Sequence, residues 1–173
     1  MTSPDLPLII PPADSFPKYA QVEIERRWLV SGDVMALLKD AEDYRDIFDR
    51  YLHGTNMRLR RVLQQGREPV YKLGKKYAED LGPGRPVVSI YLSEHEFNLL
   101  AGLPASACAK RRYRMAGGSL DVYEFPRHGL AVFEREFADA GAAERYRAPS
   151  FVGLEVTGTE RFSGAALAGI NGG

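Results

Sequence analysis

The chain has 173 residues, of which 45% are hydrophobic and 27% charged, and its formal net charge at pH 7 is zero. These values are typical of a single globular domain and exclude a disordered chain. Because the net charge is zero, we expect neither nucleic acid nor an anionic membrane as a partner, and a charged site must come from how the charges are distributed.

Residues 1–18 are expected to form a flexible arm ahead of one domain over residues 19–170. Pro7, Pro11 and Pro12 break the short apolar run of this arm, and no basic region precedes it, so we expect no signal peptide. No stretch approaches the length of a membrane-spanning helix. The only cysteine, Cys108, cannot form an internal disulfide, which fits a reducing compartment. We therefore expect a cytoplasmic protein.

The longer segments alternate with period two, which is the pattern of strands. In chain order, strands are predicted at 22–30, 44–52, 56–63, 70–77, 109–115, 119–125, 131–137 and 151–157, with a hairpin turn at His53-Gly54-Thr55. Short helices are predicted at 32–40, after the capping box of Ser93 and Glu96, and at 139–146 and 163–170. This series predicts a mainly β (α+β) fold, with a closed or nearly closed antiparallel sheet and a few short helices.

Two of the predicted strands carry pairs of glutamates on one face. Glu23 and Glu25 share a face of the first strand, and Glu134 and Glu136 share a face of strand 131–137, while Asp121 lies on strand 119–125. Carboxylates two residues apart on a strand can hold a divalent metal ion. A solvent-exposed strand face gives the same pattern, so either pair alone is weak evidence.

Three other strands carry mainly basic faces, which suit phosphate oxygens. The basic candidates are Arg58, Arg60, Lys72, Lys76, Lys110, Arg112 and Arg114. A solvent-exposed face is again the simple alternative. Exposed faces usually mix charges of both signs, however, so this segregation of acid and base favours a polyanion bridged to acid by a cation.

Six segments together resemble the CYTH or triphosphate tunnel family. Glu23-Ile-Glu25-Arg-Arg27 is similar to the family's ExExK signature, and Phe133-Glu134-Arg-Glu136-Phe137 is similar to its paired-acid strand. The remaining matches are Arg58-Leu-Arg60, Leu73-Gly-Lys-Lys76, Lys110-Arg-Arg112-Tyr113 and Gly153-Leu-Glu155-Val-Thr157. The resemblance extends from about Gln21 to Ala168.

The resemblance implies an eight-stranded antiparallel tunnel with a charged inner wall. It also implies one of the family's activities: class IV adenylyl cyclase, thiamine triphosphatase or inorganic triphosphatase. By this resemblance Mg²⁺ or Mn²⁺ would be held by Glu23, Glu25, Glu134 and Glu136, with Asp121 beside them. The triphosphate would be held by Arg58, Arg60, Lys76, Lys110 and Arg112, and Arg58 and Arg60 are also expected to assist catalysis.

The sequence departs from the family pattern at several positions. Arg27 stands where the signature has lysine, and because arginine stays protonated we expect it to clamp phosphate and stabilise charge rather than to act as a base. Gly74 replaces a hydroxyl residue, Val87 and Ser89 replace an acid pair, and Ser119 occupies a position that is often acidic.

The sequence therefore predicts a divalent-metal-dependent hydrolase of a small triphosphate-containing molecule, either inorganic tripolyphosphate or a nucleoside triphosphate. Two alternatives remain open at this stage: a class IV-type adenylyl cyclase that makes cyclic AMP from ATP, and a non-catalytic module that binds polyphosphate or nucleotide.

Overall fold

The computed structural model describes residues 17–39, 41, 43–77 and 84–170. Two predicted segments lie partly outside the described residues. They are the expected arm at 1–18, of which only residues 17 and 18 are described, and the helix predicted at 32–40, of which residue 40 is not.

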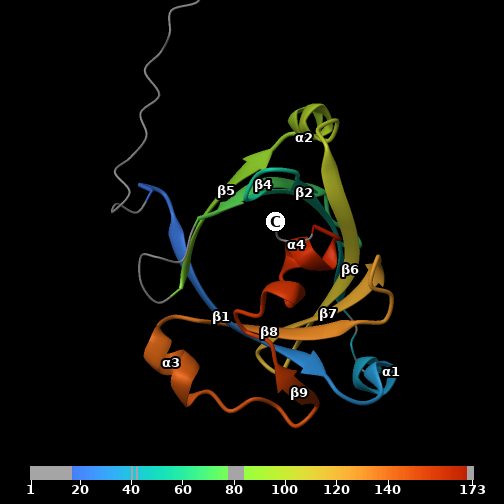
Figure 1. The fold of residues 1–173 in the computed structure, drawn as a ribbon. Coiled ribbons are helices and arrows are strands. Elements are labelled where there is room, and N and C mark those ends of the chain that lie inside the picture. Colours follow the sequence, from blue (N-terminus) through green and yellow to red (C-terminus); the bar gives the residue numbers. More distant parts are fainter. Residues whose placement is uncertain (1–16, 40, 42, 78–83, 171–173) are drawn as a thin grey trace, which may run out of the picture.

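Eight antiparallel strands close into a barrel, which Figure 1 shows in a view down its axis. They are β1 (Gln21–Val30), β2 (Tyr44–Leu52), β3 (Met57–Leu63), β4 (Val70–Lys76), β5 (Arg85–Leu92), β6 (Ala105–Met115), β7 (Gly118–Phe125) and β8 (Ala131–Phe137). A short ninth strand, β9 (Val152–Glu155), pairs with β1 on the outside of the ring. The expected mainly β, eight-stranded antiparallel tunnel is therefore confirmed.

Strand β1 closes the barrel because successive parts of it pair with different strands. Its beginning pairs with β5, where Glu23 lies opposite Arg85, and its middle pairs with β8, where Arg27 lies opposite Glu134. Its end, at Val30, pairs with β9. The strand that carries the first glutamate pair is thus connected to both ends of the sheet.

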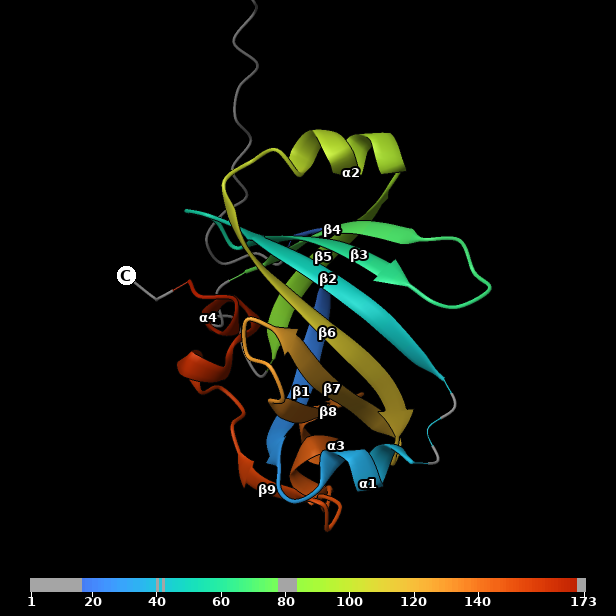
Figure 2. The same cartoon turned by 90° about the vertical axis from the view of Figure 1, so that its right-hand side faces the viewer.

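The helices are short, and Figures 1 and 2 show α1, α2 and α3 outside the ring of strands and α4 at one of its ends. They are α1 (Val34–Leu38), α2 (Glu94–Leu100), α3 (Ala140–Arg145), the 3-10 helix η1 (Glu160–Phe162) and α4 (Gly164–Leu167). The capping box at the start of α2 is present, since the Ser93 hydroxyl accepts the Glu96 N–H while the Glu96 carboxylate accepts the Ser93 N–H. Within the described part of the chain, no helix has the length and apolar character needed to cross a membrane.

The main apolar cluster lies outside the barrel wall. Trp28 and Phe133 are buried there with Leu120, and Val34 of α1 and Phe151 pack against this cluster. The Trp28 and Phe133 rings lie 6.0 Å apart. Since strand side chains alternate, burying these residues on the outer face directs their neighbours into the barrel.

A second apolar cluster is built by the end of the described chain. Leu167 and Ala168 pack against Cys108, Tyr123 and Val132. Figures 1 and 2 together place η1 and α4 at one end of the barrel. The C-terminal segment, defined as residues 160–170, therefore covers one end of the interior.

One strand of the ring was not predicted. In β5 both faces carry apolar side chains, Val87 on one and Val88 and Ile90 on the other, so the period-two signal is lost. The outer face of β1 is also less covered than its apolar pattern suggested, because Val22 remains 46% exposed while Trp28 is 3% exposed.

Candidate functional site

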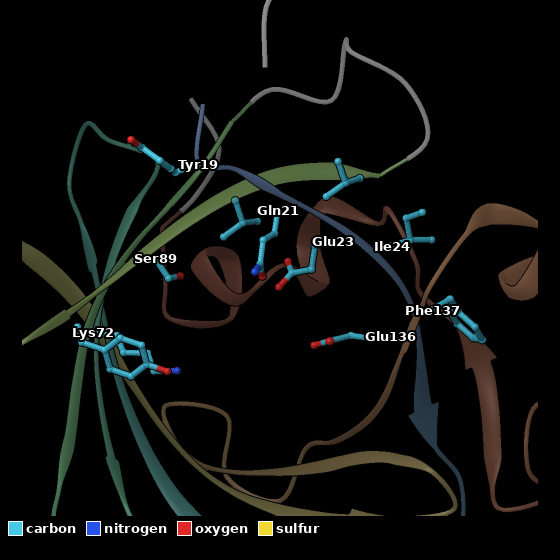
Figure 3. A pocket seen from close by; sticks show the side chains of 11 residues that line it. Tyr19, Gln21, Glu23, Ile24, Lys72, Ser89, Glu136 and Phe137 are labelled. Atoms are coloured by element: carbon cyan, nitrogen blue, oxygen red, sulfur yellow. The ribbon is translucent and has the colours of Figure 1, made fainter. Parts of the chain in front are cut away.

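Opposite charges line the inside of the barrel. Figure 3 shows Glu23, Lys72 and Glu136 pointing into the space that the strands enclose. The other predicted site residues lie on the same face of their strands and therefore also point inward. Many of them form ion pairs with side chains of neighbouring strands. The solvent-exposed alternative is therefore wrong for Glu134 and Lys110, of which the first is 14% exposed at its side chain and the second 5%.

Asp121 is the most deeply buried of the predicted acids and is neutralised by two cations. Lys110 donates a hydrogen bond to its Oδ2. Arg112 donates from Nε to Oδ1 at 2.6 Å and from Nη2 to Oδ2 at 2.7 Å, a bidentate pair. With no exposed surface and both oxygens occupied, Asp121 orients the cations in this structure rather than offering free oxygens to a metal ion.

Glu134 joins this group from β8. Arg112 also donates to its Oε2, and Arg27 donates from Nε to Oε1 at 3.1 Å. Burial alone would raise the pKa of Glu134, but the charges of Arg112, Lys110 and Arg27 outweigh it and lower the pKa well below its ordinary value. Glu134 is therefore a carboxylate that holds two arginines in place.

Asp49, which the sequence analysis missed, has the same role for the arginines of β3. It is 1% exposed and accepts two hydrogen bonds from Arg60, while Nε of Arg58 lies 3.7 Å from its Oδ1. Burial would raise the pKa of Asp49, but Arg60 and Arg58 lower it below its ordinary range. The Arg58 side chain keeps 26% of its surface exposed, so part of its guanidinium group is open to an anion.

Glu25 has a different environment, because the cations near it do not outweigh its burial and its acidic neighbours. Burial and the charge of Glu134 raise its pKa, Lys76 lowers it in part, Glu23 raises it further, and Arg27 lowers it. Lys76 itself bonds Glu23 at 2.6 Å and lies 4.0 Å from Glu25. Glu25 is thus a partly buried carboxylate whose charge is compensated only in part.

Glu136 is the direct cross-strand partner of Glu25. Side chains at such a position on one face of an antiparallel pair have Cβ atoms about 5 Å apart. Two carboxylates at that spacing repel each other, although solvent weakens the repulsion because Glu136 is exposed. Glu25 has Lys76 at 4.0 Å, a longer contact than those of Glu23, Glu134 and Asp121 with their cations, so this pair is the least compensated part of the predicted metal set.

Two cavities meet at Glu136. The β1–β5 cavity, of about 370 Å³, is lined by Gln21, Glu23, Lys72, Ser89, Tyr91 and Glu136 among others. The β2–β8 cavity, of about 580 Å³, is lined by Arg45, Arg112, Arg114, Glu134 and Glu136 among others. The predicted basic residues Lys72 and Arg114 thus lie in different cavities, with Glu136 common to both.

A metal ion requires a suitable set of donor atoms. Among the described residues no group of three or more His, Cys, Asp or Glu side chains is arranged to hold a metal ion. Mg²⁺, however, is often bound by one or two carboxylates together with waters and substrate phosphates. The charge-deficient pair of Glu25 and Glu136 supplies hard oxygen ligands of that kind, so these residues fit such an ion.

Arg27 connects the site to the C-terminal segment. Its Nη1 donates to the carbonyl of Phe162 at 2.7 Å, while its Nε holds Glu134. Burial would lower its pKa, but Glu134 and Glu25 outweigh that effect and raise it. Arg27 is therefore firmly protonated, as the sequence analysis expected.

Two tyrosines were also missed, of which Tyr123 is buried and Tyr51 partly buried. Burial and the charge of Asp49 raise the pKa of Tyr51 to about 12, and its ring lies against Gly164, where a Cβ would come within 1.9 Å of its hydroxyl. Burial and Glu134 likewise raise the pKa of Tyr123. Tyr123 shares a strand face with the predicted Asp121, but an isolated tyrosine is a common core residue and gave no separate signal.

Solved structures provide the comparison with known proteins. The structure described as the inorganic triphosphatase NE1496 is 26% identical to this chain, with a TM-score of 0.56. The match covers 88% of this chain and 98% of the NE1496 chain. Another structure of NE1496, described as a hypothetical protein, is also 26% identical, with a TM-score of 0.55. That match covers 84% of this chain and 97% of the NE1496 chain. No protein-family model matches the chain, and no curated protein matches it significantly.

The solved structures agree with the motifs. The resemblance to the CYTH or triphosphate tunnel family is confirmed by a closed barrel of the same kind over most of both chains.

Proposed function

We propose that this triphosphate tunnel protein hydrolyses a triphosphate in the presence of Mg²⁺ or Mn²⁺. The observation that carries the proposal is the convergence of arginines and lysines beside the charge-deficient pair of Glu25 and Glu136, inside a closed barrel. An anion with several phosphates would contact the cations along its length, while a divalent ion would bridge it to the glutamates. The similarity to an inorganic triphosphatase supports the same substrate class.

The arginines of β3 are suited to the terminal phosphoryl group. Asp49 orients Arg60 and lies near Arg58, so their guanidinium groups are held in place before the substrate arrives. Arg58 keeps 26% of its side chain exposed, so its guanidinium group can contact the phosphoryl group. Such fixed donors stabilise the charge that spreads over the transferring group.

Lys110, Arg112 and Arg27 are suited to the remaining phosphates. In the reaction, water attacks the terminal phosphorus and the bond from that phosphorus to its bridging oxygen breaks. Negative charge then develops on the bridging oxygen, and the protonated side chains nearby stabilise it. Lys72, Lys76 and Arg114 extend the positive wall toward the two cavities. We assign no general base, since Arg27 is firmly protonated.

Glu25 and Glu136 are the residues that would hold the divalent ion, with Glu23 and Glu134 next to them. When bound, Mg²⁺ or Mn²⁺ would neutralise phosphate charge and polarise the bond to phosphorus. In the described contacts Glu23 and Glu134 bond Lys76 and the arginines, so these carboxylates would orient the cations around the ion. Asp121 would orient Lys110 and Arg112 in the same way.

Phosphate release tests this proposal directly. Purified protein is incubated with tripolyphosphate, ATP or thiamine triphosphate, with Mg²⁺, with Mn²⁺, or with excess EDTA. We expect phosphate release with metal and none with EDTA. Full activity of the metal-free protein on metal-free substrate would contradict the metal-dependent mechanism. Detection of cyclic AMP and pyrophosphate in place of phosphate would establish the adenylyl cyclase alternative.

A non-catalytic binding module is the second candidate, and one observation favours it. Asp121, Glu134 and Glu23 are bound to cations, and the described residues contain no ready group of three metal-holding side chains. Such a module would bind tripolyphosphate tightly but release no phosphate with any metal. Calorimetric binding measured alongside the release assay separates the two functions.

The compartment is part of the proposal as well. Cys108 is a lone, buried cysteine, and burial raises the pKa of its thiol to about 11, so it is inert. A chain with one unreactive thiol is suited to the reducing cytoplasm.

A further inference from the structure

Tyr91 is an exposed aromatic residue that lines the β1–β5 cavity. It lies on β5 as the cross-strand partner of Lys72 on β4, and 73% of it is accessible to solvent. The Nζ of Lys72 lies 4.6 Å from the centre of its ring, within the range of a cation–π contact. An aromatic ring that is exposed beside a charged cavity can take a flat partner on its open surface.

The walls of this cavity favour an organic group over a further phosphate. Among the described residues that line it, Lys72 is the one cation, and that charge already faces the Tyr91 ring. Glu23 is paired with Lys76, while Glu136 would repel an additional anion. A phosphate chain that extended beyond Glu136 into this cavity would therefore meet no lining cation that is free of another contact.

Neutral polar groups complete the wall. Gln21 offers an amide and Ser89 a hydroxyl, and Figure 3 shows Gln21 next to Glu23 and Ser89 on the neighbouring strand. Amide and hydroxyl groups can donate and accept hydrogen bonds with the edge of a heterocyclic ring. The cavity also shares Glu136 with the β2–β8 cavity, so a group bound here would adjoin the proposed phosphate site.

We propose that the β1–β5 cavity is a base-binding subsite in which Tyr91 stacks on the nucleobase of a nucleoside triphosphate. This inference rests on the proposed function and refines it, since it selects nucleoside triphosphates over inorganic tripolyphosphate. Gln21 and Ser89 contact the edge of the base, and the phosphates extend past Glu136 toward the arginines. Because stacking accepts any base, the subsite discriminates weakly between ATP and GTP.

The test compares two substrates in one variant. Replacing Tyr91 with alanine removes the stacking surface, and loss of one base–aromatic stack is worth roughly 1–3 kcal/mol, or about 5- to 150-fold. We expect Tyr91→Ala to lower kcat/KM for ATP and GTP by about tenfold and to leave kcat/KM for tripolyphosphate within about twofold. Tyr91→Phe keeps the ring and should behave as wild type with every substrate.

Ile90→Ala is the matched control. Ile90 is the adjacent residue of β5, is 51% exposed, and points to the other face of the strand. Its replacement should alter none of the rates. An equal loss of Tyr91→Ala activity on ATP and tripolyphosphate would overturn the subsite, because the ring would then act on the phosphate site through Lys72. Unchanged ATP turnover in Tyr91→Ala would overturn it as well.

The result also separates this inference from the proposed function. A wild-type protein that hydrolyses tripolyphosphate but neither binds nor hydrolyses ATP would refute the base subsite and leave the hydrolase standing. If no triphosphate is hydrolysed, the hydrolase proposal fails, and the subsite is tested by calorimetry with a non-hydrolysable ATP analogue and with imidotriphosphate. Tighter binding of the analogue that is lost selectively in Tyr91→Ala would support the subsite, and equal affinities would overturn it.

Discussion

Asp49 holds Arg60 through both carboxylate oxygens, with Nε–Oδ1 at 2.6 Å and Nη2–Oδ2 at 2.7 Å. The two residues are cross-strand partners on β2 and β3, so the pair follows from the register of one hairpin. An arginine fixed in this way loses little side-chain entropy when it binds a phosphate. Asp49 is therefore expected to position Arg60, and with it Arg58, without contacting the substrate.

Asp49→Asn should impair both stability and turnover. The change leaves Arg60 and Arg58 without their buried counter-charge, and breaking such a pair costs roughly 3 kcal/mol in the free energy of unfolding. Turnover at a temperature where the variant is fully folded should still fall about tenfold or more, because the arginines are no longer oriented. Melting curves and kcat/KM are measured on the same preparation.

Asp46→Asn is the control for this change. Asp46 lies on the same strand and bonds Arg111 at 3.0 Å, but both side chains are about one third exposed. Exposed pairs contribute less than about 1 kcal/mol, so stability and activity should change little. Equal kcat/KM values for folded Asp49→Asn and wild type would remove Asp49 from its positioning role.

Arg58→Lys and Arg60→Lys should each lower kcat/KM although the charge is kept. Lysine lacks the planar fork that binds two oxygens at once, and it cannot reproduce the bidentate contact of Arg60 with Asp49. We expect a loss of about tenfold or more for each variant. Arg61→Lys is the matched control, because Arg61 lies on the same strand with its guanidinium 4.6 Å from the outer Phe48 ring. Unchanged kinetics in both Arg58 and Arg60 variants would place these residues outside the site.

The sequence was sufficient to predict the barrel and to predict which face of each predicted strand points inward. Alternation in β1 and β8 separates outward Trp28 and Phe133 from inward Arg27 and Glu134, and the structure has that arrangement. The family motifs then identified the cations as one set. Charge patterns on single strands therefore reveal a tunnel well when the opposite face is apolar.

The ion pairs between neighbouring strands were harder to predict from the sequence. The predicted turn at residues 53–55 would have set Asp49 nearly opposite Arg60, so the hairpin register was the available signal for this missed acid. Partners that are distant in the chain, such as Arg112 with Glu134, gave no such signal. The basic strands also looked nearly pure in sequence, whereas Asp49 and Asp121 neutralise much of their charge across the strands.

Glu25 should make stability depend on pH in a recognisable direction. Its pKa in the folded protein is raised above the ordinary 4.5, so over that range the folded state binds more protons than the unfolded state. The metal-free protein should therefore lose stability as pH rises from 4.5 through the raised value, and Glu25→Gln should abolish this loss. Melting temperatures of both proteins are compared over that range.

The carboxylates with lowered pKa act in another window. Glu134 and Asp49 contribute stability that is lost as pH falls through their lowered pKa values, which lie below the pH range in which Glu25 titrates. Wild type and Glu25→Gln both retain these two carboxylates. The difference between wild type and Glu25→Gln thus reports Glu25 and its neighbours Glu23, Glu134 and Lys76. Parallel melting profiles above pH 4.5 would contradict the raised pKa.

The double variant Glu23→Gln with Glu25→Gln should separate stability from activity. Neutralising Glu25 relieves its repulsion with Glu134, while Glu23 loses only its contact with Lys76, a pair about one third exposed and therefore of small value. Stability of the metal-free protein should be unchanged or higher, whereas metal-dependent phosphate release should fall by about 100-fold or more because ligands and local charge are lost.

Ligand-induced stabilisation completes this last test. Wild type should gain melting temperature from Mg²⁺ with tripolyphosphate, since a ligand that binds the folded state stabilises it by mass action, and the double variant should gain much less. Glu155→Gln makes the same chemical change on the outer strand β9, where Glu155 bonds Arg26 at 2.6 Å with its side chain 38% exposed. That control should keep full turnover and the full ligand shift. Normal turnover and an undiminished shift in the double variant would show that Glu23 and Glu25 do not hold the metal ion.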